Sequence, residues 1–317
     1  MERMTFAITV WLSATSLVLG MQCEPQRLPP PPDVPPTNFG QRVTTNGDYW
    51  FVGDQSARTW CPGDPFSCSG GVFHVYVPSP DGLTHLESIV PADIQQGMKF
   101  GGELAVHGDE LMVTASGRVW ADTDVRGGAF LYRLIDGQWV ETGRLHPPPG
   151  STREEFDFLG GHLAFDGMVA ILRPELAVKS RVAVYDRTTE GWAYKETLTA
   201  PDGLPDTAFF GENPTLGDGW LFLTAREDSS IADRAGSVYA YRRQPDNTFE
   251  FVQKLTAPDP QELGRYGFSA DYDDGRLVVG AFLMTREHRG QGIVFVYELE
   301  DGRWVLQQEL THSDAGP

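Results

Sequence analysis

The chain has 317 residues, a formal net charge of −19 and a pI near 4.7. This acidity argues against a nucleic-acid binder, because phosphate backbones are held by clustered Lys and Arg, and it disfavours docking on anionic lipid. The 35 glycines, 23 prolines and 11% aromatic residues are typical of many short strands joined by tight turns rather than of helices.

The first 20 residues, MERMTFAITVWLSATSLVLG, have the pattern of an export signal, because charged residues precede an apolar run too short to span a membrane. Residues 21–38 are rich in proline and predict an extended linker. Cys23 is a possible lipidation site, although Gln22 stands where a bacterial lipobox has a small residue. We expect an exported protein, extracellular or at the surface of a bacterial envelope, that reaches the membrane only through a lipid on Cys23.

Two periodic series run through the rest of the chain. An aromatic residue or leucine followed by glycine recurs, and an aliphatic residue stands 13 positions after each first member; these first members are Phe39, Phe100, Leu159, Phe210 and Tyr266. A tyrosine series follows, with glycine five positions earlier in every copy except Ser180; the tyrosines are Tyr76, Tyr132, Tyr185, Tyr241 and Tyr297. The repeat is about 56 residues long, and a repeat of roughly that length indicates a propeller or a solenoid.

Each repeat contains four short apolar stretches, which in the second copy are LAVHG, ELMVTA, GAFLYRL and QWVETGRL. Their length and alternation predict strands, and glycine-containing junctions between the first two stretches predict hairpin turns. Four antiparallel strands repeated around an axis make a β-propeller. We therefore predict an all-β fold, a β-propeller of five blades over residues 39–317, with repeats starting near residues 39, 100, 159, 210 and 266. An incomplete ring is the alternative.

The carboxylates of YGFSADYDDGRLVVGAF, Tyr266 to Phe282, have two interpretations. Asp271, Asp273 and Asp274 could begin a calcium loop or form the tip of a hairpin. The other copies have no carboxylate cluster at this position, and the connection is too short for the alternating oxygens of a calcium loop. We expect a hairpin tip, no bound metal and no cofactor.

The repeats resemble the bacterial FG-GAP-type repeat, a relative of the repeats in the integrin α-chain propeller. The resemblance rests on phrases such as KLTAPDPQELGRYGFSADYDDGRLVVGAF followed by GIVFVYELEDGRWVLQQELT, and it spans Phe39 to about Leu310. It implies a secreted or surface-exposed propeller that is usually noncatalytic. The best-known members have seven blades and often carry calcium loops, and this chain departs from them on both counts.

The candidate binding residues fall in two groups. Polar residues that could ring the mouth of the channel stand three positions after each aromatic–glycine mark; they are Arg42, Glu103, His162, Asn213 and Ser269. Long connections between the second and third strands of the repeats offer further candidates, which are Trp60, Trp120, Asp122, Asp124, Arg126, Arg286 and His288. An exposed indole beside carboxylates suits a carbohydrate or protein contact. The alternative is that each tryptophan packs inside its own loop and holds that loop in place.

Cys61 and Cys68 are seven positions apart, and we expect them to form a disulfide in an oxidising compartment.

Three functions remain open. The favoured one is a monomeric, noncatalytic binding module for a protein or a carbohydrate, and not an enzyme. The alternatives are a purely structural envelope protein and a propeller glycoside hydrolase, which needs two carboxyl groups across one bond. Glu103 is the only acidic residue at the five mouth positions, with Asp271 as its only conceivable partner. No HExxH, GxSxG or phosphate-loop motif occurs.

Overall fold

The computed structural model describes residues 38–61, 67–175, 180–286 and 290–311. The predicted export signal, the candidate lipidation site Cys23, nearly all of the linker and the candidate residue His288 lie outside these ranges. The side chain of Trp60 is likewise not described. No described helix is long and apolar enough to cross a membrane.

Five four-stranded antiparallel sheets contain most of the described chain, one for each repeat. The first has the order β1-β2-β5-β6 and consists of β1 (Arg42–Thr45), β2 (Trp50–Asp54), β5 (Val72–Ser79) and β6 (Gly82–Ile89). The second consists of β7 (Phe100–His107), β8 (Glu110–Ala115), β9 (Ala129–Ile135) and β10 (Gln138–Leu145). The third consists of β11 (Leu159–Phe165), β12 (Val169–Pro174), β13 (Arg181–Thr188) and β14 (Gly191–Thr199).

The fourth and fifth sheets follow the same order. The fourth consists of β15 (Thr215–Gly217), β16 (Trp220–Ala225), β17 (Ser237–Arg243) and β18 (Phe249–Leu255). The fifth consists of β19 (Ser269–Asp273), β20 (Arg276–Ala281), β21 (Ile293–Glu300) and β22 (Arg303–Thr311). These sheets confirm the prediction of an all-β fold with four antiparallel strands per propeller blade.

The connections contain the remaining short elements. A two-stranded sheet within the first blade pairs β3 (Arg58–Trp60) with β4 (Ser67–Ser69), and a disulfide joins Cys61 to Cys68 at its end. The helix α1 (Arg153–Phe156) precedes β11, and the 3-10 helix η1 (Asp206–Ala208) precedes β15. The turn between β19 and β20 is formed by Asp274 and Gly275 alone, so the carboxylates at that place are a hairpin tip.

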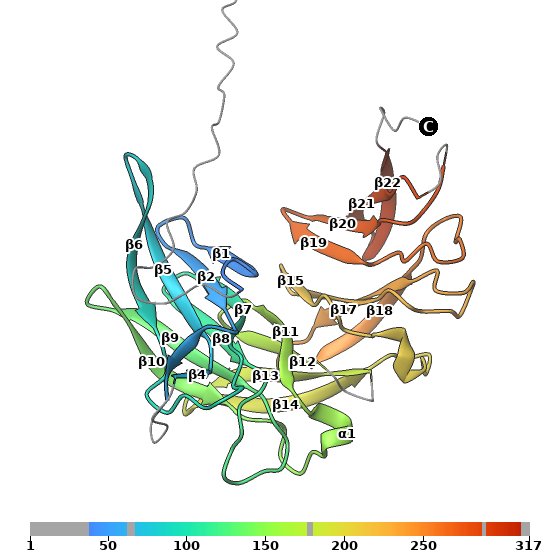
Figure 1. Cartoon of the computed structure of the whole chain (residues 1–317). Coiled ribbons are helices and arrows are strands. Elements are labelled where there is room, and N and C mark those ends of the chain that lie inside the picture. The colour runs from blue at the N-terminus through green and yellow to red at the C-terminus, as the bar shows by residue number, and fades with distance from the viewer. Residues whose placement is uncertain (1–37, 62–66, 176–179, 287–289, 312–317) are drawn as a thin grey trace, which may run out of the picture.

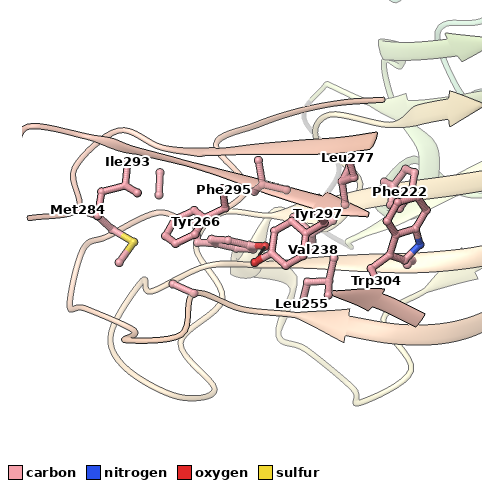
Figure 2. Close-up of a cluster of buried hydrophobic side chains, with 14 of the residues drawn as sticks. Phe222, Val238, Leu255, Tyr266, Leu277, Met284, Ile293, Phe295, Tyr297 and Trp304 are labelled. Carbon is pink, nitrogen blue, oxygen red and sulfur yellow. Dashed lines mark hydrogen bonds between the residues drawn. The ribbon is translucent and has the colours of Figure 1, made fainter. Parts of the chain in front are cut away.

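Four clusters of buried side chains hold the blades together, one between each pair of sheets that are consecutive along the chain. Figure 2 shows the cluster between the fourth and fifth sheets, in which Phe222 and Val238 pack against Leu277, Phe295 and Trp304. Because strand side chains alternate between the two faces, each inner blade contributes one face to each of two clusters. The tryptophans of the fourth strands pack in these clusters: Trp139 and Trp304 are buried and Trp192 is partly buried.

The two ends of the series do not meet. In Figure 1 the sheets form an open arc, with β1 and β19 at its two ends and the other innermost strands between them. Neighbouring innermost strands pack along this arc, since β1 contacts β7, β7 contacts β11, β11 contacts β15 and β15 contacts β19. The incomplete ring, the alternative to a closed one, is therefore the arrangement that the described residues adopt.

Candidate active site at the inner strands

A pocket of about 150 Å³ lies where the innermost strands of the first three sheets begin. We call it the mouth pocket. Two positions of the repeat line it: the polar residue at the start of the innermost strand, and the residue that follows the second strand. The lining residues on which the site depends are Arg42, Glu103, Ser116, His162 and Glu175.

Glu103 is the most enclosed carboxyl of the mouth pocket, with 15% of its side chain exposed. Its Oε2 lies 2.7 Å from Nε of Arg42, and its backbone N–H donates to the Thr114 hydroxyl at 2.9 Å. Burial raises the pKa of Glu103 above its ordinary value, the Arg42 guanidinium opposes this rise, and the nearby Glu175 adds to it. Glu103 therefore holds a proton more readily than an ordinary glutamate does.

Glu175 has a different environment on the same pocket. Lys99 Nζ donates to both of its carboxylate oxygens, at 2.8 and 2.7 Å, and the Ser116 hydroxyl donates to Oε2 at 3.0 Å. Lys99 itself has a left-handed backbone, with φ of 55°, and its ammonium lies 5.2 Å from the centre of the Phe158 ring. A cation and a hydroxyl thus fix the positions of the two Glu175 oxygens.

His162 supplies a neutral imidazole to the mouth pocket. Burial, together with the positive charges of Arg173, Arg42 and Arg226, lowers its pKa to about 3. Arg173 is buried, and its guanidinium donates to the carbonyls of Phe210 and Pro174, both at 3.1 Å. At neutral pH the imidazole can therefore donate one hydrogen bond and accept another, without carrying charge.

The other two predicted mouth residues lie on later blades and outside this pocket. The Asn213 side chain donates to the Phe268 carbonyl at 2.7 Å, which ties the fourth blade to the fifth. Ser269 is exposed at the start of β19. The structure thus brings together Arg42, Glu103 and His162 from the predicted set.

The predicted loop residues are mostly engaged with their own protein. Trp120 is only 7% exposed; its indole N–H donates to the Gly127 carbonyl at 2.6 Å and its ring stacks 3.9 Å from that of His146. The expectation of an exposed indole is therefore wrong for Trp120, because the loop closes over its own aromatic residue. The Asp122 carboxylate is 73% exposed and lies 4.0 Å from His146.

The cationic loop residues are paired. Arg126 forms two side-chain bonds to the Asp157 carboxylate, at 3.1 and 2.6 Å, and lies 3.8 Å over the Phe158 ring. Arg286 makes an equivalent pair with Glu309 at 3.1 Å, and the Asp124 carbonyl accepts a bond from Arg153 at 2.8 Å. These residues brace the connections. Asp124 and Arg126 line a pocket of about 450 Å³ with Trp120 and Asp122, and Arg286 is not part of it.

Sequence reasoning missed Glu175, Lys99 and Ser116. A signal for two of them exists, because the third position after the aliphatic mark of each repeat is variable and polar in four copies; the five residues are Gln55, Ser116, Glu175, Arg226 and Phe282. This position follows the second strand and faces the same space as the start of the first. No group of three or more side chains suited to holding a metal occurs in the part of the chain that the structure describes.

Comparisons with known proteins give a fold likeness without a family. No family model matches the chain, and no curated protein matches it. A functionally unknown protein from Desulfotomaculum acetoxidans is similar in structure at 11% identity and a TM-score of 0.48, covering 84% of this chain and 70% of that one. The periplasmic gluconolactonase of Pseudomonas aeruginosa is similar at 18% identity and a TM-score of 0.46, covering 85% of this chain and 69% of that one.

One of these two proteins is an enzyme. The prediction of a noncatalytic binding module, and with it the prediction that the chain is not an enzyme, rested on the resemblance to FG-GAP-type repeats and on the single acidic residue at the five mouth positions. Both predictions are corrected: the named similar structure is a gluconolactonase, and Glu175 is a second carboxyl on the mouth pocket.

Proposed function

We propose that the chain is a hydrolase whose active site is the mouth pocket, and that it cleaves a glycosidic bond. The observation that carries the proposal is the pair of carboxyl groups on one small pocket, Glu103 and Glu175, in opposite environments. Environments that separate the protonation of two carboxyls are how glycosidases assign an acid and a base.

Glu103 is the general acid. Burial favours its protonated form, so it can give its proton to the glycosidic oxygen as the bond to the anomeric carbon breaks. The loss of that proton leaves a carboxylate 2.7 Å from Arg42 Nε, which stabilises the new charge.

Glu175 acts on the anomeric carbon, as the base for an attacking water or as the nucleophile of a two-step reaction. In both routes one water is consumed and its hydroxyl ends on the anomeric carbon. Its proton passes to Glu175 in the one-step route, from where exchange with solvent restores Glu103, and to Glu103 directly in the two-step route. Lys99 and Ser116 fix the carboxylate oxygens, which keeps the negative charge at one place.

The size and polarity of the mouth pocket fit one end of a carbohydrate. Its volume of about 150 Å³ is below the ~300–1,000 Å³ of ordinary small-molecule sites, so a single terminal unit is the expected occupant. Arg42 and the neutral His162 supply hydrogen bonds for ring hydroxyls.

A panel of aryl glycosides tests the proposal. The wild-type chain should release the aryl group from at least one terminal glycoside. Glu175→Gln should lower kcat/KM by at least about 100-fold on every active substrate, and Glu103→Gln should do so on unsubstituted phenyl glycosides, whose leaving group needs a proton. Glu298→Gln is the matched control, since Glu298 is an exposed carboxyl paired with Arg276 on the fifth sheet. A panel without turnover, or turnover of a sugar lactone alone, would contradict glycoside cleavage.

A further inference from the structure

The contact between consecutive blades follows one rule. Three of these contacts include an isolated parallel β-bridge. The bridge joins the glycine that stands five positions before the recurring tyrosine to the aromatic or leucine residue that opens the next blade. The bridges are Gly71 with Phe100, Gly127 with Leu159, and Gly236 with Tyr266. The backbone N–H of the opening residue donates to the carbonyl just before the glycine, as from Tyr266 to Ala235 at 2.8 Å. Ser180 departs from the rule and bonds to Asp206.

The side chains that face the next blade are fully covered in the first four blades. On the second strand, this position holds Phe51, Met112, Ile171 and Phe222, and each of them is 0% exposed. On the third strand, the two positions that face the next blade are at most 4% exposed in all four sheets. A neighbouring blade is therefore what buries these positions.

The fifth blade has the same positions without a neighbour. Val278 on β20 is 37% exposed, Val294 and Val296 on β21 are partly exposed, and Leu310 on β22 is 44% exposed. We call these four residues the open face. The opposite face of the same sheet lies in the cluster drawn in Figure 2. Terminal units of repeat proteins usually have a polar outer face, and this one is apolar.

The backbone beside the open face is also shaped for a neighbour. Gly292 has a φ of +79°, close to the values of the equivalent glycines of the other blades, which are Gly71 (+92°), Gly127 (+99°) and Gly236 (+86°). Unlike them, it forms no parallel bridge among the described residues. A groove of about 430 Å³ runs beside it, lined by Phe268, Phe282 and Leu310 among others. The fifth blade thus carries every feature that the other blades use to receive the next opening residue.

The complementary half lies at the other end of the described chain. Phe39 and Gly40, which we call the opening edge, bear the same mark as Tyr266 and Gly267. Gly40 N–H bonds to the Gly53 carbonyl as Gly267 N–H bonds to the Gly280 carbonyl. Phe39 packs on its own third strand as Phe100 does, with its ring centre 5.5 Å from that of His74, but it stays partly exposed, whereas Phe100 is fully buried.

We propose that the open face of one copy binds the opening edge of a second copy, head to tail. The two halves belong to one repeated interface, and within one chain they lie at opposite ends of the arc (Figure 1). The contact differs from an isologous one, because different surfaces of the two copies meet. This departs from the monomer that the sequence predicts.

The net charge of the chain sets the salt dependence of this contact. Two copies that each carry −19 repel one another, while the surface that joins them is apolar. Added salt screens the repulsion between the two negative copies and leaves the hydrophobic contribution of the interface in place. Association should therefore strengthen as the ionic strength rises. An interface built on ion pairs would show the opposite trend.

The test is the mass of the full chain in solution, by light scattering or sedimentation equilibrium across a concentration series. The wild-type chain should form dimers or larger assemblies, and Val278→Asp should weaken association at least about tenfold, because it would bury an unpaired charge. Val140→Asp is the matched control, a strand valine of the second blade that is 41% exposed. It should leave association unchanged.

A mixing experiment distinguishes head-to-tail from face-to-face contact. Phe39→Asp removes the opening edge and Val278→Asp removes the open face, so each variant alone should be monomeric while their mixture should associate. Circular dichroism confirms that each variant is folded. A wild-type chain that stays monomeric at all concentrations would overturn the proposal, and so would a Phe39→Asp chain that associates as well as the wild type.

Discussion

Arg42 of β1 and Glu103 of β7 form an ion pair across two neighbouring blades, with 2.7 Å between Nε and Oε2. The pair joins two opposing effects on one carboxyl, because burial raises the pKa of Glu103 and the guanidinium lowers it. The protonation of Glu103 at a given pH therefore depends on Arg42.

Arg42→Gln should change the pH profile of hydrolysis in a defined direction. Without the guanidinium the pKa of Glu103 moves further upward, so the acid stays protonated to higher pH and the falling alkaline limb of kcat/KM shifts upward. Arg276→Gln serves as the control, because Arg276 pairs with the distant Glu298 at 2.8 Å. An alkaline limb that does not move, or moves downward, would remove Glu103 from the role of acid.

Gly236→Ala should destabilise the contact between the fourth and fifth blades. Gly236 has a φ of +86°, and an added Cβ would lie 2.1 Å from the Tyr266 carbonyl oxygen, so the cost should be about 3 kcal/mol or more. Gly137→Ala is matched in backbone, with a φ of +80° and open space around the Cβ, and should cost only about 1–2 kcal/mol. Denaturant unfolding measures both, and equal losses would refute the role of close approach.

His74 should make the fold sensitive to mild acid. Burial and the neighbouring His85, opposed in part by Asp54, lower its pKa to about 4, and its Nδ1 lies 2.8 Å from the Ser88 hydroxyl. Between pH 4 and the ordinary value near 6.5 the unfolded chain binds the extra proton, so the free energy of unfolding rises with pH there. The contribution is complete above about pH 6.5 and falls by at most about 3 kcal/mol toward pH 4.

The matched variant for this prediction is His74→Gln. The difference in stability between pH 7 and pH 5 should be smaller in the variant than in the wild type, as measured by urea unfolding at each pH. The pKa of His162 is also lowered, so the stability of the variant should still rise with pH, but less steeply. An identical slope in both proteins would show that His74 is not the group involved.

The disulfide between Cys61 and Cys68 should contribute modestly to stability. A cross-link that closes so short a loop removes little entropy from the unfolded chain, so the double variant Cys61→Ala with Cys68→Ala should lose about 2 kcal/mol. Unfolding with and without reductant gives the value. Non-reduced peptide mapping that joins either residue to Cys23 would contradict the pairing.

The fold could be predicted from the sequence because its repeated marks have a physical cause. The glycine before each third strand and the aromatic residue that opens each blade are the two partners of one bridge, as Gly236 and Tyr266 show, so both recur together. The register of the first two strands also follows the repeat. The aliphatic residue 13 positions after the opening aromatic pairs with the residue four positions after it, as Val113 does with Leu104 and Val279 with Ala270.

The site was only partly predictable. Arg42, Glu103 and His162 stand at one equivalent position of the repeat. Glu175 stands at another, three residues after the aliphatic mark, but its contacts with Lys99 and Ser116 depend on the fold and have no sequence pattern. The burial of Trp120 could not be read from the sequence either, because it depends on where the loop turns back to present the Gly127 carbonyl. Loops follow no repeat period, so their aromatic residues carry no signal of exposure.

The measurement that tests the central claim most directly is the leaving-group dependence of hydrolysis by Glu103→Gln. Leaving groups that depart as stable anions need no proton, so turnover of a dinitrophenyl glycoside should stay close to the wild-type rate. Turnover of the matching alkyl glycoside should fall by at least about 100-fold, because its oxygen must be protonated as it leaves. Equal losses on both substrates, or no loss on either, would contradict the assignment of Glu103 as the acid of a glycoside hydrolase.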